Sequence, residues 1–373
     1  MRHLLPHWRK SHPLPQNGLG RAVSVTVPAR FDFIGGWTDT PPYYFDNPAA
    51  VLNGVLRLRQ FGSSGAFVTP IRIRVSPAQK FSYCINGEKM DRILPDDGVA
   101  QGVFYFLDLH RPSVEISIEN AIPRGSGLGG SSLLSLGLLT ALRAYWEGAL
   151  KAIASPREMI NDVLMIEQLI GSGGGWQDQI GGLLPGIKLI QTLPGQEQYR
   201  VSFLPQEATS ALQDRTLMVD TRQSRKAVII LSSIREKYIN REPETVATLA
   251  AIRNNAKEGF LALARKDIRA FSALMHSSWG QVCAVESAIS SFLPNTLSTM
   301  AGISGYKLGG AGGGGFLMIV ADSQESRARI AEDLHKIFPQ CLLFEPDFTG
   351  SGLEVEQGGQ TFSVPVESKE ILV

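Results

Sequence analysis

The chain has 373 residues, with 36 Lys and Arg against 35 Asp and Glu and a formal net charge of +1. Its length predicts two domains, each large enough to bury a core. The balanced charge argues against a nucleic-acid surface or a polybasic membrane surface, because both need an excess of cations. The three cysteines are widely spaced and odd in number, so we expect neither a disulfide framework nor a zinc site. Residues 1–15 lack the apolar segment of a signal peptide, and we expect a cytoplasmic protein with no membrane segment.

The first half of the chain predicts strands followed by helices. Alternating segments rich in β-forming residues indicate strands at 21–34, 67–77, 81–87, 113–120 and 186–193. Helical periodicity follows at 131–149 and 156–170. Ser155 and Pro156 are typical of the start of the second helix, and Gly171 is typical of its end.

The second half begins near residue 205 and contains more helix. Helices are expected at 224–239, 243–265, 267–289 and 324–337, and strands at 216–221, 316–321 and 341–345. The last thirty or so residues are polar and predict a peripheral hairpin or tail. Helices alternating with strands, but with hairpin-like strands early, favour an α+β fold over a doubly wound sheet. We place the two domains at 1–205 and 206–373.

Glycine is the unusual component of the composition. The chain has 38 glycines, and 21 of them fall within four segments: 35–36, 125–130, 171–186 and 302–315. Such local clustering differs from low complexity and points to loops with a specific role.

The segment PRGSGLGGSS at 123–132 lies between a predicted strand and a predicted helix. Converging backbone N–H groups, a helix dipole and glycines that admit close approach together predict an anion site. The loop lacks the lysine of a Walker A motif. It matches GxGxxG, but another helix follows where a dinucleotide-binding fold requires a strand. A glycine turn needed only for packing is the alternative.

The segment GSGGGWQDQ at 171–179 follows a helix that carries Glu167. Phosphoryl transfer to a hydroxyl needs a carboxylate near the acceptor and an oxygen ligand for Mg²⁺, and Asp178 with Glu167 could supply both. Two acids at this spacing are weak evidence alone, because a solvated helix acid and a loop cap would look the same.

Two further segments combine glycine with charged residues. In KLGGAGGGGF at 307–316, six of the seven residues 309–315 are glycine. Because glycine loses the most backbone entropy on folding, this run suggests close approach to a ligand or another loop, or tight packing. In ARFDFIGGWTDTPP at 29–42, Arg30, Asp32 and Asp39 surround a glycine turn. Asp32 could equally be an ordinary turn or strand-end acid.

Together these segments resemble the GHMP kinase superfamily. Its three motifs occur in order as RFDFIGGWTD, PRGSGLGGSS and GGAGGGGF, and the resemblance spans roughly 22–350. Within the superfamily, GGWTDTPP, GGGWQDQIGGLLPGIK and DTRQSRKA look most like L-fucokinases, while heptose-phosphate kinases share weaker forms of them. The resemblance implies an N-terminal domain of ribosomal-protein-S5-like fold, a ferredoxin-like C-terminal domain, and a small-molecule sugar and Mg²⁺-ATP as ligands. We expect a monomer or homodimer without nucleic-acid or membrane partners.

Site residues are carried over by position in these motifs. Asp178 matches the catalytic aspartate, which would accept the proton of the anomeric hydroxyl, and Arg30 is assigned to catalysis with it. Ser131 and Glu167 match the Mg²⁺ ligands. The resemblance assigns ATP binding to Pro123, Gly125, Ser126, Gly127, Leu128, Gly129, Gly130, Ser131, Ser132 and Arg225. It assigns the substrate to Gly36, Trp37, Asp39, Gly312 and Gly313.

Two departures leave the substrate open. The phosphate loop reads GLGGSS where GLGSSA is usual, and Arg222 replaces a glycine beside Arg225. The first expectation is a sugar 1-kinase that acts on L-fucose. A kinase for D-glycero-D-manno-heptose 7-phosphate or another sugar is the alternative, and the two arginines could then serve the extra phosphate. A catalytically silent sugar-binding regulator is the second alternative. We expect no nucleotidyltransferase activity from this segment.

Overall fold

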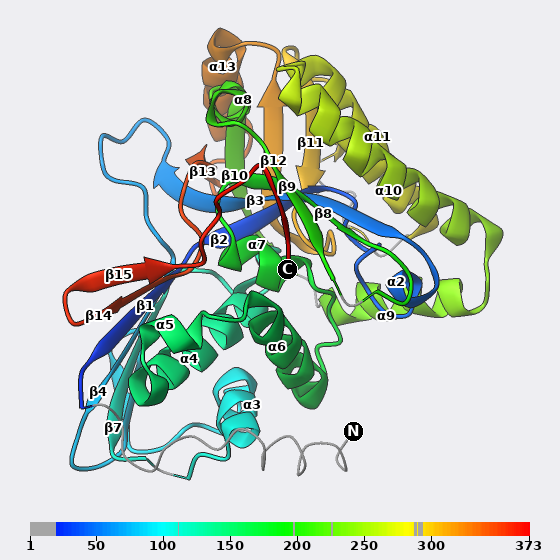
Figure 1. The fold of residues 1–373 in the computed structure, drawn as a ribbon. Helices are drawn as coiled ribbons and strands as arrows, with labels where there is room; N and C mark the ends of the chain where they lie inside the picture. Colours follow the sequence, from blue (N-terminus) through cyan, green and yellow to red (C-terminus); the bar gives the residue numbers. More distant parts are fainter. Residues whose placement is uncertain (1–19, 111, 197, 225–226, 287–288, 290–293) are drawn as a thin grey trace.

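The computed structural model describes residues 20–110, 112–196, 198–224, 227–286, 289 and 294–373. It has the predicted α+β architecture, with two sheets and helices packed against them (Figure 1). The strand expected at 21–34 is divided at Pro28 into β1 (Val23–Val27) and β2 (Ala29–Ile34). The two strands join different sheets, because proline has no N–H with which to continue a ladder.

The first sheet has seven strands in the order β15-β14-β1-β4-β7-β5-β6. Besides β1 they are β4 (Ile71–Pro77), β5 (Ser82–Ile85), β6 (Glu88–Met90), β7 (Val114–Asn120), β14 (Glu354–Gln357) and β15 (Gln360–Ser363). Strands β14 and β15 form the expected C-terminal hairpin, which extends the sheet beyond β1. A segment near the C-terminus and the first described strand therefore lie in one sheet.

Five helices of the first half surround this sheet and the candidate site. They are α3 (Gly98–Leu107), α4 (Gly130–Glu147), α5 (Ala149–Ala152), α6 (Pro156–Ile170) and α7 (Gln177–Leu183). Helix α4 packs on β1 and β4, and most of its side chains are buried. The predicted ends of α6 are confirmed, because the Ser155 hydroxyl accepts the Glu158 N–H and Gly171 adopts φ 79°. Helices α3 and α7 were not predicted.

The second sheet has nine strands and connects the two halves of the chain. Its order is β11-β12-β10-β13-β3-β8-β9-β16, and β2 pairs with β3. The strands are β2, β3 (Ala49–Gln60), β8 (Ile187–Thr192), β9 (Arg200–Phe203), β10 (Thr216–Ser224), β11 (Ile303–Leu308), β12 (Gly314–Ala321), β13 (Leu342–Asp347) and β16 (Glu370–Leu372). The long strand β3 was not predicted, because its first half is apolar without alternation.

The helices described in the second half are α8 (Gln206–Gln213), α9 (Ala227–Ile239), α10 (Pro243–Ala264), α11 (Ile268–Val285), α12 (Pro294–Leu297) and α13 (Gln324–Ile337), with the short α2 (Tyr43–Asp46) from the first half beside α9. Four of them, α9, α10, α11 and α13, match the expected segments, whereas α8 and α12 were not predicted. Helices α10 and α11 pack on each other, α10 against β3 and α11 against β11 (Figure 1). Within the described residues, no helix is both long and apolar enough to cross a membrane.

Candidate active site

The glycine loop at 123–130 leads directly into helix α4. Gly125, Gly127 and Gly129 all have positive φ angles, of 73°, 75° and 81°. The side chains between them, Ser126 and Leu128, are buried. Gly129 is the N-cap of α4, and no side chain of the described residues caps the helix. The first N–H groups of this 18-residue helix could therefore bind an anion, and the anion site expected from the sequence stays a prediction.

The glycine run at 309–315, here called the third glycine run, lies directly against this loop. The Phe316 N–H donates to the Ser126 carbonyl at 2.9 Å. A Cβ on Gly127 would lie 2.4 Å from the Gly309 carbonyl oxygen, and one on Gly315 would lie 2.2 Å from that of Ser126. Two backbones can come this close only without side chains. The run therefore determines the shape of the 123–130 loop.

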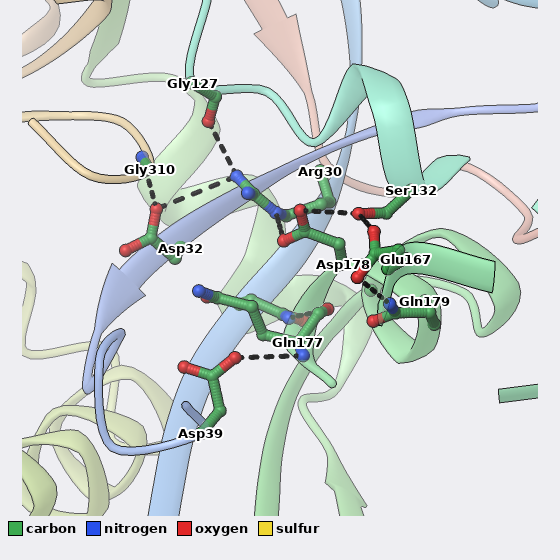
Figure 2. Close-up of polar contacts among 12 residues, drawn as sticks. Arg30, Asp32, Asp39, Gly127, Ser132, Glu167, Gln177, Asp178, Gln179 and Gly310 are labelled. Carbon is green, nitrogen blue, oxygen red and sulfur yellow. Dashed lines mark hydrogen bonds and ion pairs between the residues drawn. The ribbon is translucent and has the colours of Figure 1, made fainter. Parts of the chain in front are cut away.

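Arg30 connects strand β2 to helix α7 and to the glycine loop. Its Nε donates to Asp178 Oδ1 at 2.6 Å, and its Nη1 donates to the Gly127 carbonyl at 2.7 Å (Figure 2). The Arg30 side chain is 4% exposed and that of Asp178 is 19% exposed. A buried guanidinium that donates to both groups fixes the Asp178 carboxylate beside the loop.

Glu167 lies in the last turn of α6, where it is almost fully buried. It accepts hydrogen bonds from the Ser132 hydroxyl and from Gln179 Nε2, the latter at 3.1 Å (Figure 2). Burial raises the pKa of Glu167 to about 8, and the nearby negative charge of Asp178 adds to the shift. The Ser132 hydroxyl also lies 3.2 Å from Asp178 Oδ2. Two carboxylates thus share one hydroxyl, an arrangement that a bound cation would stabilise.

The structure distinguishes the two serines at the start of α4. Ser132 is buried against Glu167, whereas Ser131 is exposed. Neighbouring helical residues point about 100° apart, so only one of them can face the carboxylates. The assignment of Ser131 as a metal ligand stays a prediction, and the serine that contacts Glu167 is Ser132.

Asp39, from the first motif, is fully buried beside the start of α7. Its Oδ2 accepts the Gln177 N–H at 3.2 Å (Figure 2). Its Oδ1 has no hydrogen-bond partner among the described residues. Burial, with a contribution from the Asp178 charge, raises the pKa of Asp39 to about 7. A Cβ on Gly175 would lie only 2.1 Å from Asp39 Oδ2, so the glycine segment at 171–175 is also shaped by close approach.

The other residues assigned to the substrate or to ATP make fewer contacts with the groups described above. Trp37 is 9% exposed with φ 83°, and it belongs to an apolar cluster with Tyr43 and Tyr238. Gly312 and Gly313 are buried, and Gly312 lies against the Trp279 ring. Gly36 lies against the Asp32 carboxylate. The assignment of Trp37, Gly36, Gly312 and Gly313 to the substrate stays a prediction, and Arg225 lies outside the described residues.

Sequence reasoning missed the buried ion pair of Asp32 with Lys307. The Lys307 ammonium contacts the Asp32 carboxylate and donates to its carbonyl oxygen at 2.5 Å. The Gly310 N–H donates to Asp32 Oδ1 at 2.9 Å (Figure 2). Asp32 therefore anchors the third glycine run to β2. The available signal in the sequence was that Asp32 and Lys307 have opposite charges and that each lies close to a glycine-rich motif.

Family models for two domains match the chain in the order of its halves. The model of the GHMP kinases N terminal domain matches residues 98–186, which contain the glycine loop, Glu167 and Asp178. The model of the GHMP kinases C terminal domain matches residues 260–340, which contain the third glycine run. The chain belongs to the GHMP kinase family.

Curated relatives of this chain include sugar kinases. The chain is 29% identical over 342 residues to a bifunctional fucokinase/GDP-fucose pyrophosphorylase of Arabidopsis thaliana, covering 85% of this chain and 31% of the relative. It is 28% identical to an L-fucokinase/L-fucose-1-P guanylyltransferase of Bacteroides fragilis, over 94% of this chain and 40% of the relative. It thus spans well under half of both proteins. A D-glycero-alpha-D-manno-heptose 7-phosphate kinase of Campylobacter jejuni is 25% identical, over 81% of this chain and 90% of the relative.

Solved structures show the same GHMP kinase fold. A D-glycero-D-manno-heptose 1-phosphate kinase from Bacteroides thetaiotaomicron superposes with a TM-score of 0.67 at 18% identity, over 90% of this chain and 98% of the other. Galactokinase of Lactococcus lactis, solved with galactose, gives a TM-score of 0.66 at 16% identity, over 89% and 94% of the two chains. These comparisons confirm the predicted α+β fold of the superfamily.

Proposed function

We propose that the chain is an ATP-dependent sugar kinase that phosphorylates the anomeric hydroxyl of a free sugar, with L-fucose as the first candidate. The observation that carries the proposal is the position of Asp178. Arg30 holds its carboxylate at 2.6 Å, near the N-terminus of α4 and near buried Asp39. Among the described residues, no side chain caps α4 and none bonds Asp39 Oδ1. A carboxylate next to an anion site suits phosphoryl transfer to a hydroxyl.

Each part of the site has a role in this reaction. The N–H groups of the glycine loop and of α4 bind the ATP phosphates and stabilise the charge that develops during transfer. Asp178 orients the acceptor hydroxyl and takes its proton as the oxygen bonds to the γ-phosphorus and the bond to ADP breaks. Arg30 keeps the Asp178 carboxylate aligned with that hydroxyl. Asp39 Oδ1 accepts a hydrogen bond from a second sugar hydroxyl.

The residues around Glu167 fit a magnesium ion. Mg²⁺ is commonly bound through one or two carboxylates together with substrate phosphates, and needs no complete protein cage. Among the described residues there is no group of three or more His, Cys, Asp or Glu that could hold a metal ion alone. Glu167 would hold the ion together with Ser132, the serine at the start of α4 that contacts it. Bound there, Mg²⁺ would neutralise charge on the phosphates.

The two serines give a test of this arrangement. We expect Ser132→Ala to raise the Mg²⁺ concentration needed for half-maximal turnover by roughly tenfold or more, because Glu167 loses its hydroxyl partner. The matched variant Ser131→Ala, one residue away and exposed, is expected to change it far less. Mg²⁺ titrations of both variants provide the measurement. If Ser131→Ala raises this Mg²⁺ concentration more than Ser132→Ala does, the metal ligand is Ser131, as the motif predicted.

The contact between the two glycine loops gives a second test. We expect Gly127→Ala to raise the KM for ATP by about tenfold, or ~1.4 kcal/mol of binding, because the new Cβ meets the Gly309 carbonyl and displaces the loop. Gly62→Ala is the matched control, since both glycines have φ 75° but a methyl group added at Gly62 would have no atom within 4 Å. If both variants raise the KM for ATP equally, backbone strain alone, and not the contact with Gly309, accounts for the effect.

The sugar is tested with a panel of free sugars and sugar phosphates, assayed for ADP release with ATP and Mg²⁺. L-fucose is expected to give the highest kcat/KM, since the two fucokinase relatives align with 85% and 94% of this chain. Heptose 7-phosphate is the second candidate, because the heptose kinase relative is matched over 90% of its own length. If heptose 7-phosphate is turned over and L-fucose is not, that alternative is established. Sugar binding without any turnover would establish a silent regulator.

A further inference from the structure

Helix α7, which carries Asp178 in its first turn, is weak by itself. It has only seven residues, Gln177–Leu183, two of which are glycines, and no side chain caps its start. Such a short helix is marginal without external contacts, and glycine lowers its stability further. The position of Asp178 therefore depends on what holds α7.

A row of buried polar side chains on the second sheet lies beneath this helix. Asp32 of β2 pairs with Asn53 of β3, and Asn53 pairs with Lys188 of β8, so all three share one face of the sheet. Each is at most 1% exposed. Asn53 Nδ2 donates to the Gln177 carbonyl at 2.9 Å, at the start of α7. Lys188 Nζ donates at 3.1 Å to the Gly181 carbonyl, in the last turn of the helix.

The sequence explains why Gly181 needs this donor. The residue four positions later is Pro185, which has no N–H, so the Gly181 carbonyl cannot form the usual helical hydrogen bond. Lys188 supplies the missing donor and also bonds the Gly186 carbonyl at 3.1 Å in the turn that follows. A cation at the C-terminal end of a helix is also favoured by the helix dipole.

Providing these hydrogen bonds from a lysine costs free energy, because its ammonium must be removed from water. The ammonium is fully buried, and burial lowers its pKa to about 7. None of the ion pairs in the described part of the chain includes it, so carbonyl groups alone replace its hydration. A buried amine without a carboxylate is rarely favoured for stability alone.

We propose that Lys188 is a positioning residue for the transfer reaction: by holding the last turn of α7 to strand β8, it fixes Asp178 at the other end of the helix. The inference rests on the proposed kinase function. Lys188 touches neither substrate, and it acts only through the position of the helix.

The test is Lys188→Met, which keeps the length of the side chain and removes its donors. Because small displacements of a catalytic group can cost up to about 100-fold, we expect kcat to fall roughly 10- to 100-fold. The KM for ATP should stay within about twofold, since the glycine loop is untouched. Backbone amides of residues 177–184 should exchange hydrogen faster, while exchange in α4 is unchanged. The control Ile190→Val, also buried on β8, should change neither readout.

Two further variants separate positioning from general damage. Lys188→Gln keeps a donor on a shorter chain, and should recover part of the lost kcat and of the amide protection. In an Asp178→Asn background, Lys188→Met should lower kcat no further, because the group it positions has been removed. Unchanged kcat, unchanged exchange in 177–184, or an equal loss in Ile190→Val would overturn the proposal. If no sugar is turned over by the unmodified protein, the proposed function fails, while the exchange data still decide whether Lys188 holds α7.

Discussion

Replacing Asp178 by Asn should lower kcat about 10²–10⁴-fold while the protein stays folded, because a positioned general base contributes an effect of that size. Asn can still accept a hydrogen bond from Arg30 Nε, so the local geometry changes little. It cannot take the proton of the acceptor hydroxyl. Initial rates with saturating ATP and sugar, on protein whose circular dichroism matches that of the unmodified chain, give the measurement.

Asp91→Asn is the matched control, since Asp91 is exposed and follows β6 at the edge of the first sheet. It removes the same charge and should leave kcat unchanged. The KM for ATP should be similar in all three proteins, because the phosphates are bound by the loop. An Asp178→Asn protein that keeps near-full turnover would exclude Asp178 as the base and leave the proposed site without its central residue.

Lys307→Met should lower the free energy of unfolding by about 3–5 kcal/mol, the usual cost of removing one partner from a buried ion pair. The Asp32 carboxylate is 1% exposed and would lose its ammonium partner, keeping the Gly310 N–H and Arg30 at 3.8 Å. Since Asp32 anchors the third glycine run, the KM for ATP should rise as well. Urea unfolding and ATP titration are the two measurements.

The double variant Asp32→Asn with Lys307→Met should recover much of the lost stability, because no uncompensated charge remains buried. Lys89→Met serves as the surface control. Lys89 forms an ion pair too, with Glu115 at 3.1 Å, but its side chain is 68% exposed. We therefore expect Lys89→Met to change the free energy of unfolding by less than about 1 kcal/mol. If Lys307→Met is no less stable than Lys89→Met, the buried pair does not anchor the glycine run.

Features governed by local backbone chemistry were predictable from the sequence. Ser155 and Gly171 mark the ends of α6 because capping depends only on residues a few positions away. The glycine loop was recognisable since positive φ angles at Gly125, Gly127 and Gly129 require glycine. Helix α7 was missed because two glycines and a nearby proline obscure its helical pattern.

The sequence by itself determined the α+β class, the three glycine motifs and the candidacy of Arg30, Glu167 and Asp178. Only the tertiary structure decided which groups meet. It placed Ser132 beside Glu167 because helix geometry allows just one of two adjacent serines to face inward. It paired Asp32 with Lys307, which are 275 residues apart, and brought Lys188 under α7 through strand register. Such contacts depend on burial between distant segments, which no local pattern encodes.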